Sequence, residues 1–374
     1  MKVAVVHDWF NDEGGAEKVI KEILVCFPEA DVYCLFDFFD AEKRKKYLSS
    51  KPTHRSFIQR IPFAKKFYRF LFPLFPKAIE SLDLSGYDLI ISSSFCVAKG
   101  INKTAKQLHI CYCHSPVRYA WDLRRDYLAA VHGALIKKTF SYFLDKLKKW
   151  DIDSSIRVDY FIANSINVQK RIFENYARES VVIYPPVNIS AFTITQNKSD
   201  YFFTVARLVA YKKTELIIRA FSKMPHLELQ VAGVGPNLGK LRRIATPNVK
   251  MLGYIDSQTK KEKIGNAKAF LGAANEDFGI TMVEAQASGT PVIVPYIGGY
   301  IETVLDTTGL FYKNQNVEDI VVAVTKFENE KRKFKSSDFI DNVERFNVAR
   351  FQKEFMEFVN SKYTQFIESR DKSA

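Results

Sequence analysis

The sequence lacks the features of a membrane-spanning or exported chain. No stretch approaches the roughly 18 consecutive apolar residues that a transmembrane helix needs. The first ten residues, MKVAVVHDWF, run directly into a strand-like segment, without the charged, apolar and small-residue regions of a signal peptide. Cysteine is scarce, and its five copies form an odd number, so a disulfide framework is not indicated. These absences predict a reduced protein of the cytoplasm.

Metal and dinucleotide signatures are also missing. The sequence CYCH contains Cys111, Cys113 and His114, but on a strand the two thiols share one face and the imidazole takes the other. This arrangement does not indicate a zinc site, and we expect no bound metal. No Gly-x-Gly-x-x-Gly fingerprint follows the first strand-like run, which argues against a nucleotide-sugar epimerase or dehydrogenase.

Positive charge is what the sequence has in excess, with a formal net charge of +13. Lysine and arginine are interleaved with Phe, Tyr and Leu in two segments, Glu42–Lys77 and Ile136–Trp150. Such segments suit an anionic membrane surface, because apolar groups enter the interface while cations stay with the lipid phosphates. The alternative is a helical hairpin whose lysines are only solvated. A nucleic-acid partner is not expected, because the basic segments match no binding motif.

Strand-like and helix-like segments alternate along the chain in two series, and the apolar content of 47% is enough for two cores. The strand-like runs are 2–9, 87–94, 107–116, 158–165 and 180–186, then 201–208, 227–235, 249–255, 267–274 and 290–299. Alternation of this kind predicts an α/β fold with parallel sheets covered on both faces. The Pro185–Pro186 pair favours a boundary between the two halves. We therefore expect Rossmann-like domains at 1–187 and 188–345, and C-terminal helices at 346–374 that pack back toward the first domain.

Polar and glycine-rich stretches follow the strands of the second series. In an open α/β sheet, ligands bind at the carboxyl ends of the strands. Arg207 and Lys212 can neutralise a diphosphate there, and the helix that opens near Gly279 favours an anion at its N-terminus. Glu284, about one turn into that helix, can accept two ribose hydroxyls, and Glu276 in the preceding loop can bond to a sugar. The alternative is a capped helix with Glu284 in a surface salt bridge.

The order of these stretches resembles the C-terminal domain of glycosyltransferase family 4, the retaining enzymes of GT-B fold, in which two Rossmann-like domains face each other across a cleft. EDFGITMVEAQASGTPVI is close to the family motif throughout. In the first half, GGAEKV resembles the family's Gly-Gly loop. CHSPVRYAWD and ISSSFCVAKG resemble the bacterial mannosyltransferases that build O-antigen polysaccharide. The resemblance covers most of the chain and thins over Glu42–Lys77 and after Lys313.

By this resemblance, Arg207 and Lys212 hold the donor diphosphate and Glu276 contacts the donor sugar. Glu284 binds the nucleoside ribose, and His114 sits near the reacting sugar. The remaining donor contacts implied by the family are Gly14, Gly15, Gly253, Tyr254, Ile255, Phe278, Gly279, Ile280 and Thr281. One departure is a lysine at position 213, where many members have glycine.

The resemblance implies a retaining hexosyltransferase that needs no metal. The N-terminal motifs favour transfer of mannose from GDP-mannose to a polyprenyl-diphosphate-linked glycan, at the inner face of the cytoplasmic membrane. A UDP-sugar donor and a non-catalytic subunit of the same fold are the alternatives. A metal-dependent GT-A transferase is disfavoured, because the one Asp-x-Asp sequence, Asp151–Asp153, follows a lysine-rich helical segment rather than a strand.

Overall fold

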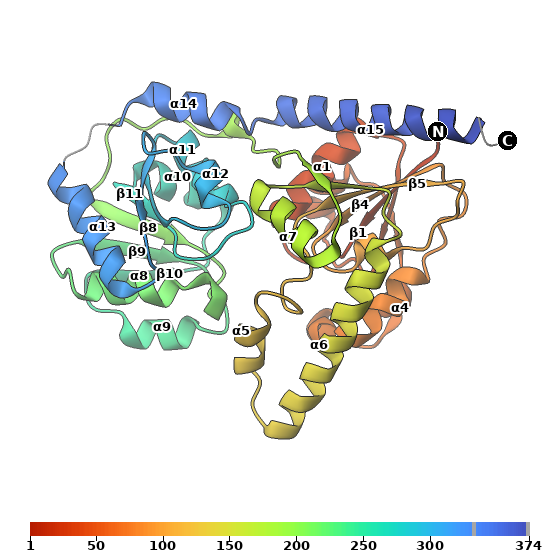
Figure 1. Ribbon diagram of the computed structural model, residues 1–374. Coiled ribbons are helices and arrows are strands. Elements are labelled where there is room, and N and C mark those ends of the chain that lie inside the picture. Colours follow the sequence, from red (N-terminus) through yellow and green to blue (C-terminus); the bar gives the residue numbers. More distant parts are fainter. Residues whose placement is uncertain (331–333, 372–374) are drawn as a thin grey trace. The chain divides into compact units, whose positions relative to one another are not determined.

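Two parallel sheets form the framework of the chain (Figure 1). The computed structural model describes residues 1–330 and 334–371. Contacts divide the chain into unit 1, Met1–Pro186 together with the segment that starts at Val348, and unit 2, Val187–Asn347. The expected α/β class with two Rossmann-like sheets is confirmed, and each unit is described separately below.

Unit 1 contains a seven-stranded parallel sheet in the order β3-β2-β1-β4-β5-β6-β7. Its strands are β1 Val3–His7, β2 Asp31–Cys34, β3 Thr53–Arg55, β4 Leu89–Ser94, β5 Leu108–Cys113, β6 Tyr160–Ala163 and β7 Ser180–Val182. Its helices are α1 Gly15–Cys26, α2 Ala41–Leu48, α3 Ala64–Phe67, α4 Phe75–Glu80, α5 Arg124–Ala129, α6 Ala134–Ser155, α7 Ile166–Tyr176 and α15 Val348–Asp371. Short 3₁₀ helices include η2, Tyr68–Leu74.

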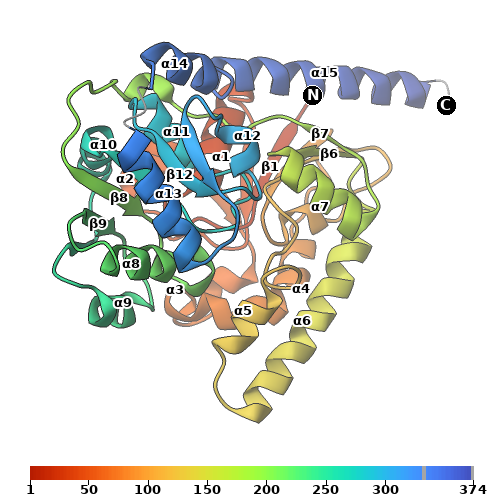
Figure 2. The same cartoon turned by 60° about the vertical axis from the view of Figure 1, so that its left-hand side comes forward.

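Both faces of this sheet are buried, as a parallel sheet requires. Val3 and Val5 of β1 pack into one core with α1, and Ala4 and Val6 pack into a second core on the opposite face. Helix α15 covers the first face: three of its side chains, Phe351, Phe355 and Val359, are fully buried in that core. Figures 1 and 2 both show α15 running beside α1. The C-terminal helix is therefore part of the hydrophobic core of unit 1.

Unit 2 contains a six-stranded parallel sheet in the order β10-β9-β8-β11-β12-β13. Its strands are β8 Tyr201–Val205, β9 Glu228–Ala232, β10 Val249–Gly253, β11 Ala269–Leu271, β12 Val292–Pro295 and β13 Gly309–Tyr312. Its α-helices are α8 Thr214–Ser222, α9 Leu238–Ile244, α10 Ser257–Asn266, α11 Ile280–Ala287, α12 Tyr300–Thr303, α13 Val317–Glu330 and α14 Ser336–Glu344. Phe202 and Phe203 of β8 enter separate cores, so this sheet is also covered on both faces.

Some helices begin with a side-chain cap, whereas several others, among them α1 and α11, do not. Ser165 and Asp256 cap α7 and α10, because their side-chain oxygens accept backbone N–H bonds from the first turn. Helices α1 and α11 instead begin after Gly14 and Gly279 and have no side-chain cap. Both of these helices follow the Gly-containing loops that the sequence assigned to donor binding.

Candidate functional site

The predicted donor-binding residues of unit 2 lie at one end of its sheet, where the carboxyl ends of the strands meet. Arg207 and Lys212 follow β8, Gly253 ends β10, and Glu276 follows β11. These are the carboxyl ends of parallel strands, where the topology of an open sheet places ligands. The structure therefore brings the predicted residues of this half together.

Lys212 and Glu276 contact each other directly, although the sequence assigned one to the donor diphosphate and the other to the donor sugar. The Lys212 ammonium lies 2.6 Å from Glu276 Oε1, and both side chains are 23% exposed. Burial lowers the pKa of Lys212, but the Glu276 carboxylate outweighs it, so the pKa is raised above its ordinary value. Lys212 is thus a cation that Glu276 holds in place. The side chain of the other predicted cation, Arg207, is exposed.

The glycine pair Gly298–Gly299 positions the loop that carries Glu276. The Gly299 N–H donates to the Glu276 carbonyl oxygen at 2.9 Å. A side chain at Gly299 would collide with the backbone of Phe278, so only glycine allows this close approach. The Phe278 ring itself is buried and packs against Phe346 with ring centroids 5.3 Å apart. Any contact of Phe278 with a ligand would therefore come from its backbone.

Glu284 is held by a cation that the sequence did not single out. It lies in α11, is 1% exposed, and its Oε2 is 2.7 Å from the Lys260 ammonium of α10. A carboxylate so deeply buried requires a charged or hydrogen-bonding partner, which gives Lys260 its role. The sequence offered little signal, because Lys260 is one of several lysines in a highly charged helix.

The expected nucleobase region has an exposed aromatic side chain. Tyr254 follows β10 and is 77% exposed, while Ile255 is partly buried. Gly253 has a φ of +72° and Gly233, after β9, has a φ of +127°. A side chain at Gly233 would meet the Ala206 carbonyl oxygen, so this glycine lets two strand-end loops lie against each other.

In unit 1, His114 belongs to a buried polar cluster. It follows β5 directly and is half-buried. Its Nε2 lies 2.8 Å from the Ser93 hydroxyl of β4, and Ser93 also contacts His7 at the end of β1. Burial lowers the pKa of His114 to about 3, with the neighbouring His7 adding to the effect. The His114 ring is therefore neutral at ordinary pH.

The loop after β4 is shaped by a buried carboxylate. Asp8 follows β1, and its oxygens accept four backbone N–H bonds, from Phe95 through Ala98, at 2.5–2.9 Å. Burial raises the pKa of Asp8, and these amides oppose the rise. Sequence reasoning missed both His7 and Asp8, although a His-Asp pair at the carboxyl end of a strand is a signal that could have identified them. The predicted Gly14 and Gly15 lie nearby in sequence, at the start of α1.

The Asp-x-Asp sequence has a structural role. It lies inside α6, and Asp151 is buried with its Oδ1 2.6 Å from the Lys99 ammonium. Its Oδ2 accepts hydrogen bonds from Trp121 and Tyr176. Across residues 1–330 and 334–371, no group of three His, Cys, Asp or Glu side chains could hold a metal ion. In the same ranges, no helix is both long and apolar enough to cross a bilayer.

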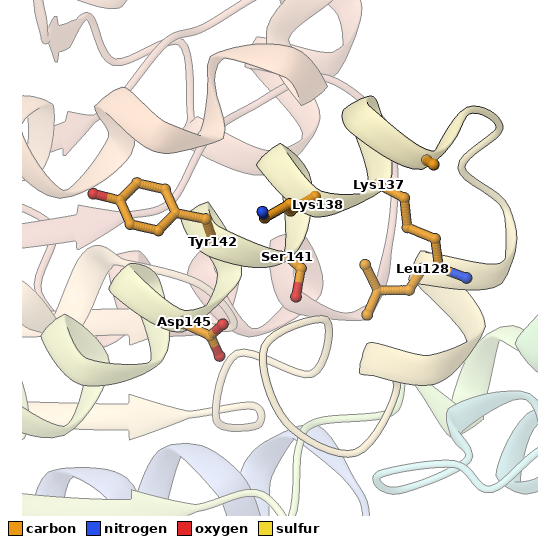
Figure 3. Close-up of a pocket in the computed structure, with 7 residues that line it drawn as sticks. Leu128, Lys137, Lys138, Ser141, Tyr142 and Asp145 are labelled. Atoms are coloured by element: carbon orange, nitrogen blue, oxygen red, sulfur yellow. The ribbon is translucent and has the colours of Figure 1, made fainter.

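A surface groove of about 550 Å³ lies between α5 and α6 of unit 1 (Figure 3). None of the predicted site residues lines it. Its walls are Leu128, Ala134, Lys137, Lys138, Ser141, Tyr142 and Asp145. Most of its lining therefore belongs to the basic aromatic segment Ile136–Trp150, and none of it belongs to the predicted site.

Comparison with protein families gives two matches that together span most of the chain. Residues 13–191 match the family described as Glycosyltransferase Family 4, and residues 188–345 match Glycosyl transferases group 1. The boundary between the two matches falls near the boundary between the structural units.

Two curated relatives are mannosyltransferases. A GDP-mannose-dependent monoacylated alpha-(1-6)-phosphatidylinositol monomannoside mannosyltransferase of Corynebacterium glutamicum is 34% identical over 130 residues, 31% of this chain and 34% of the relative. The alpha-1,3/1,6-mannosyltransferase ALG2 of Dictyostelium discoideum is 22% identical over 295 residues, 65% of this chain and 67% of the relative. The first match thus spans about a third of that relative's length.

Solved structures share the fold over nearly the whole length of the chain. HepE of Anabaena, in complex with UDP, has a TM-score of 0.69 at 17% identity and covers 96% of this chain and 100% of its own. Sucrose-phosphate synthase of Thermosynechococcus elongatus has a TM-score of 0.70 at 15% identity, covering 98% of this chain and 100% of its own. At these identities the likeness shows the fold.

Proposed function

The chain belongs to the GT-B glycosyltransferases, with a family 4 domain followed by a group 1 domain, and on this premise we propose that it transfers mannose from GDP-mannose with retention of configuration. The acceptor we propose is a polyprenyl-diphosphate-linked glycan of a bacterial surface polysaccharide such as O-antigen. The mannosyltransferases among its relatives support the choice of sugar. The observation that carries the proposal is the Lys212–Glu276 pair at the ligand-binding edge of the unit 2 sheet.

The proposed chemistry follows from the charges at that edge. Breaking a sugar–diphosphate bond places negative charge on the leaving group, and Lys212, Arg207 and the uncapped start of α11 supply positive potential. The anomeric carbon becomes oxocarbenium-like, as in glycoside hydrolysis. In the proposed step, the acceptor hydroxyl attacks on the face that the diphosphate leaves, and the departing phosphate takes its proton. The two cations do the work that a metal ion does in other transferases, so we propose no metal cofactor.

A UDP-sugar donor is the second candidate. Solved structures of HepE contain UDP or UDP-glucose, and the HepE chain aligns over nearly the whole length of this one. A backbone-lined base site around Gly253 would not by itself separate uracil from guanine.

A donor screen tests both candidates. The purified protein is incubated with each sugar nucleotide and a lipid-linked acceptor extract, and released GDP or UDP is measured. Release of GDP from GDP-mannose alone supports the proposal. Release of UDP from a UDP-sugar rejects mannose as the sugar while the transferase activity stands. No release from any donor favours a non-catalytic subunit of the same fold.

We also propose that unit 1 contacts an anionic membrane surface, where a lipid-linked acceptor would lie. In the basic aromatic segment Glu42–Lys77, some aromatic side chains are buried and others are exposed. Phe72 and Phe75 lie in the core, whereas Phe63 and Phe70 are 77% and 79% exposed. Helix α6 packs beside this segment, because its Phe140 contacts Phe72 with ring centroids 5.2 Å apart.

The start of α6 offers both groups that a membrane contact needs. Residues 132–139 are all exposed, and Leu135 and Ile136 expose 78% and 64% of their surface. Lys137 and Lys138 follow directly and line the groove beside α5 (Figure 3). Apolar side chains that enter the interface, with cations worth about 1 kcal/mol each near anionic lipid, suffice for reversible binding.

Liposome co-sedimentation tests this surface. Binding should rise with anionic lipid and fall with salt, and Leu135→Ser with Ile136→Ser should weaken it. Phe173→Ser is the matched control, because Phe173 lies on α7 of the same unit and is also 64% exposed. If the wild-type protein stays in the supernatant with anionic liposomes at low salt, or if the control variant loses as much binding, this surface is not the contact.

A further inference from the structure

Three side chains, from β1, from β4 and from the residue directly after β5, form a hydrogen-bonded relay that ends at His114. His7 closes β1 and lies beside Ser93 of β4 in the sheet register. His7 Nδ1 is 3.1 Å from the Ser93 carbonyl oxygen and 3.2 Å from its hydroxyl. The same hydroxyl is 2.8 Å from His114 Nε2. His7 and Ser93 are fully buried, so solvent does not compete for these bonds.

The position of each proton follows from what each group can do. A carbonyl oxygen only accepts, so His7 Nδ1 must carry a hydrogen. The Ser93 hydroxyl accepts part of that bond, which leaves its own hydrogen to donate to His114 Nε2. If His114 Nε2 donated instead, the serine hydrogen would have no acceptor among the contacts of this cluster. The relay therefore assigns the hydrogen of the neutral His114 ring to Nδ1.

Glu17 lies beside the other end of the relay, without a hydrogen bond to His7. His7 Nε2 is buried without a hydrogen-bond partner, and the Glu17 Oε1 lies 3.7 Å from it. Glu17 is 6% exposed and lies in the first turn of α1, directly after the Gly14–Gly15 loop. The cluster thus extends from the start of α1 to His114.

We propose that His7 and Ser93 are positioning residues that lock His114 in the tautomer with hydrogen on Nδ1, so that His114 offers a hydrogen-bond donor to an oxygen of the transferred sugar. The inference rests on the proposed function for the presence of a sugar beside His114. Because the ring is neutral, it binds a hydroxyl oxygen without adding charge near the oxocarbenium-like centre. A sugar that lacks an oxygen at the contacted position would lose this bond.

The tautomer can be measured without any substrate. Long-range proton–nitrogen NMR spectra of histidine-labelled protein distinguish a protonated ring nitrogen from an unprotonated one, and His114→Gln identifies its signals. We expect a protonated Nδ1 and an unprotonated Nε2 for His114 in the wild-type protein. Ser93→Ala should shift this ring toward the other tautomer. A wild-type His114 protonated on Nε2, or a pattern unchanged in Ser93→Ala, would overturn the proposal.

A neighbouring pair on the same two strands provides the control. The Ser92 hydroxyl lies 2.8 Å from His109 Nε2, so Ser92→Ala should alter the His109 signals and leave those of His114 unchanged. In the transferase assay, Ser93→Ala should lower turnover roughly tenfold, the loss of one neutral hydrogen bond, and Ser93→Thr should restore part of it. An inactive wild-type protein would reject the proposed function, whereas the NMR result would still decide the tautomer.

Discussion

Replacing Lys212 by alanine is the sharpest test of the proposed chemistry. Its ammonium is 2.6 Å from Glu276 and only partly exposed, so solvent screens it weakly. Two unit charges about 4 Å apart at an effective dielectric of about 20 interact by about 4 kcal/mol. Because Lys212 is shared between Glu276 and the diphosphate, we expect a loss of about 3 kcal/mol in the transition state. Turnover should then fall roughly 100-fold, the usual cost of one donor at a developing negative charge.

The pairing also predicts how Lys212 and Glu276 depend on each other. In Lys212→Ala the Glu276 carboxylate loses this cation and repels the incoming diphosphate. Relative to the wild type, the turnover of the double variant Lys212→Ala/Glu276→Gln should therefore be higher than the product of the relative turnovers of the two single variants. The assay is steady-state release of the nucleoside diphosphate, with thermal unfolding to confirm the fold.

The control is a lysine–glutamate pair of the same unit that lies on the surface. Lys223 and Glu318 are 2.9 Å apart and 57% and 68% exposed, so Lys223→Ala should change turnover by no more than roughly threefold. If Lys212→Ala is as active as this control, Lys212 does not stabilise the leaving group and the diphosphate clamp is refuted.

Further expectations concern ligand binding, metal dependence and pH. Glu284→Gln should weaken the calorimetric affinity for free GDP, while Glu276→Gln should lower turnover and leave that affinity nearly intact; equal GDP affinities in the two variants would reject these roles. Activity should survive EDTA, and complete loss that manganese or magnesium restores would indicate a metal-dependent mechanism. Burial lowers the pKa of His109 from 6.5 to about 4. The unfolded chain therefore binds more protons between these values, and stability should fall by up to about 3 kcal/mol as pH drops through this window. Urea unfolding of the wild type and His109→Gln measures the effect, and an equal acid dependence in both would contradict it.

Much of the fold could be predicted from patterns that local sequence carries. The longer apolar runs, such as those that form β4 and β5, showed their strands clearly. Strands β2, β3 and β13 were missed, although β7 and β11 are equally short and were predicted, so length alone does not account for these misses. β3 also has exposed His54 and Arg55, which read as part of the basic segment rather than as an edge strand.

For the site, the sequence predicted which residues follow the carboxyl ends of the strands, but it did not predict the contacts between their side chains. The order of motifs placed Lys212 and Glu276 at one edge of a sheet, and the structure agrees. That these two side chains contact each other, or that Lys260 holds Glu284, depends on helix packing that no local pattern encodes. The His-Asp pair at the end of β1 could have drawn attention to His7, but its partners, which come from β4 and α1, could not be predicted from a local pattern. The roles assigned to these residues in the reaction stay predictions.

The placement of α15 has a consequence for the order in which the chain acquires structure. Unit 2 is one continuous segment, so it can complete its core as soon as Asn347 has been synthesised. Unit 1 begins earlier but needs Phe351, Phe355 and Val359 to cover one face of its sheet. During synthesis, that face stays uncovered while the whole of unit 2 is being made, which exposes apolar surface to aggregation or to chaperones. The domain that is translated first is therefore the domain that finishes folding last.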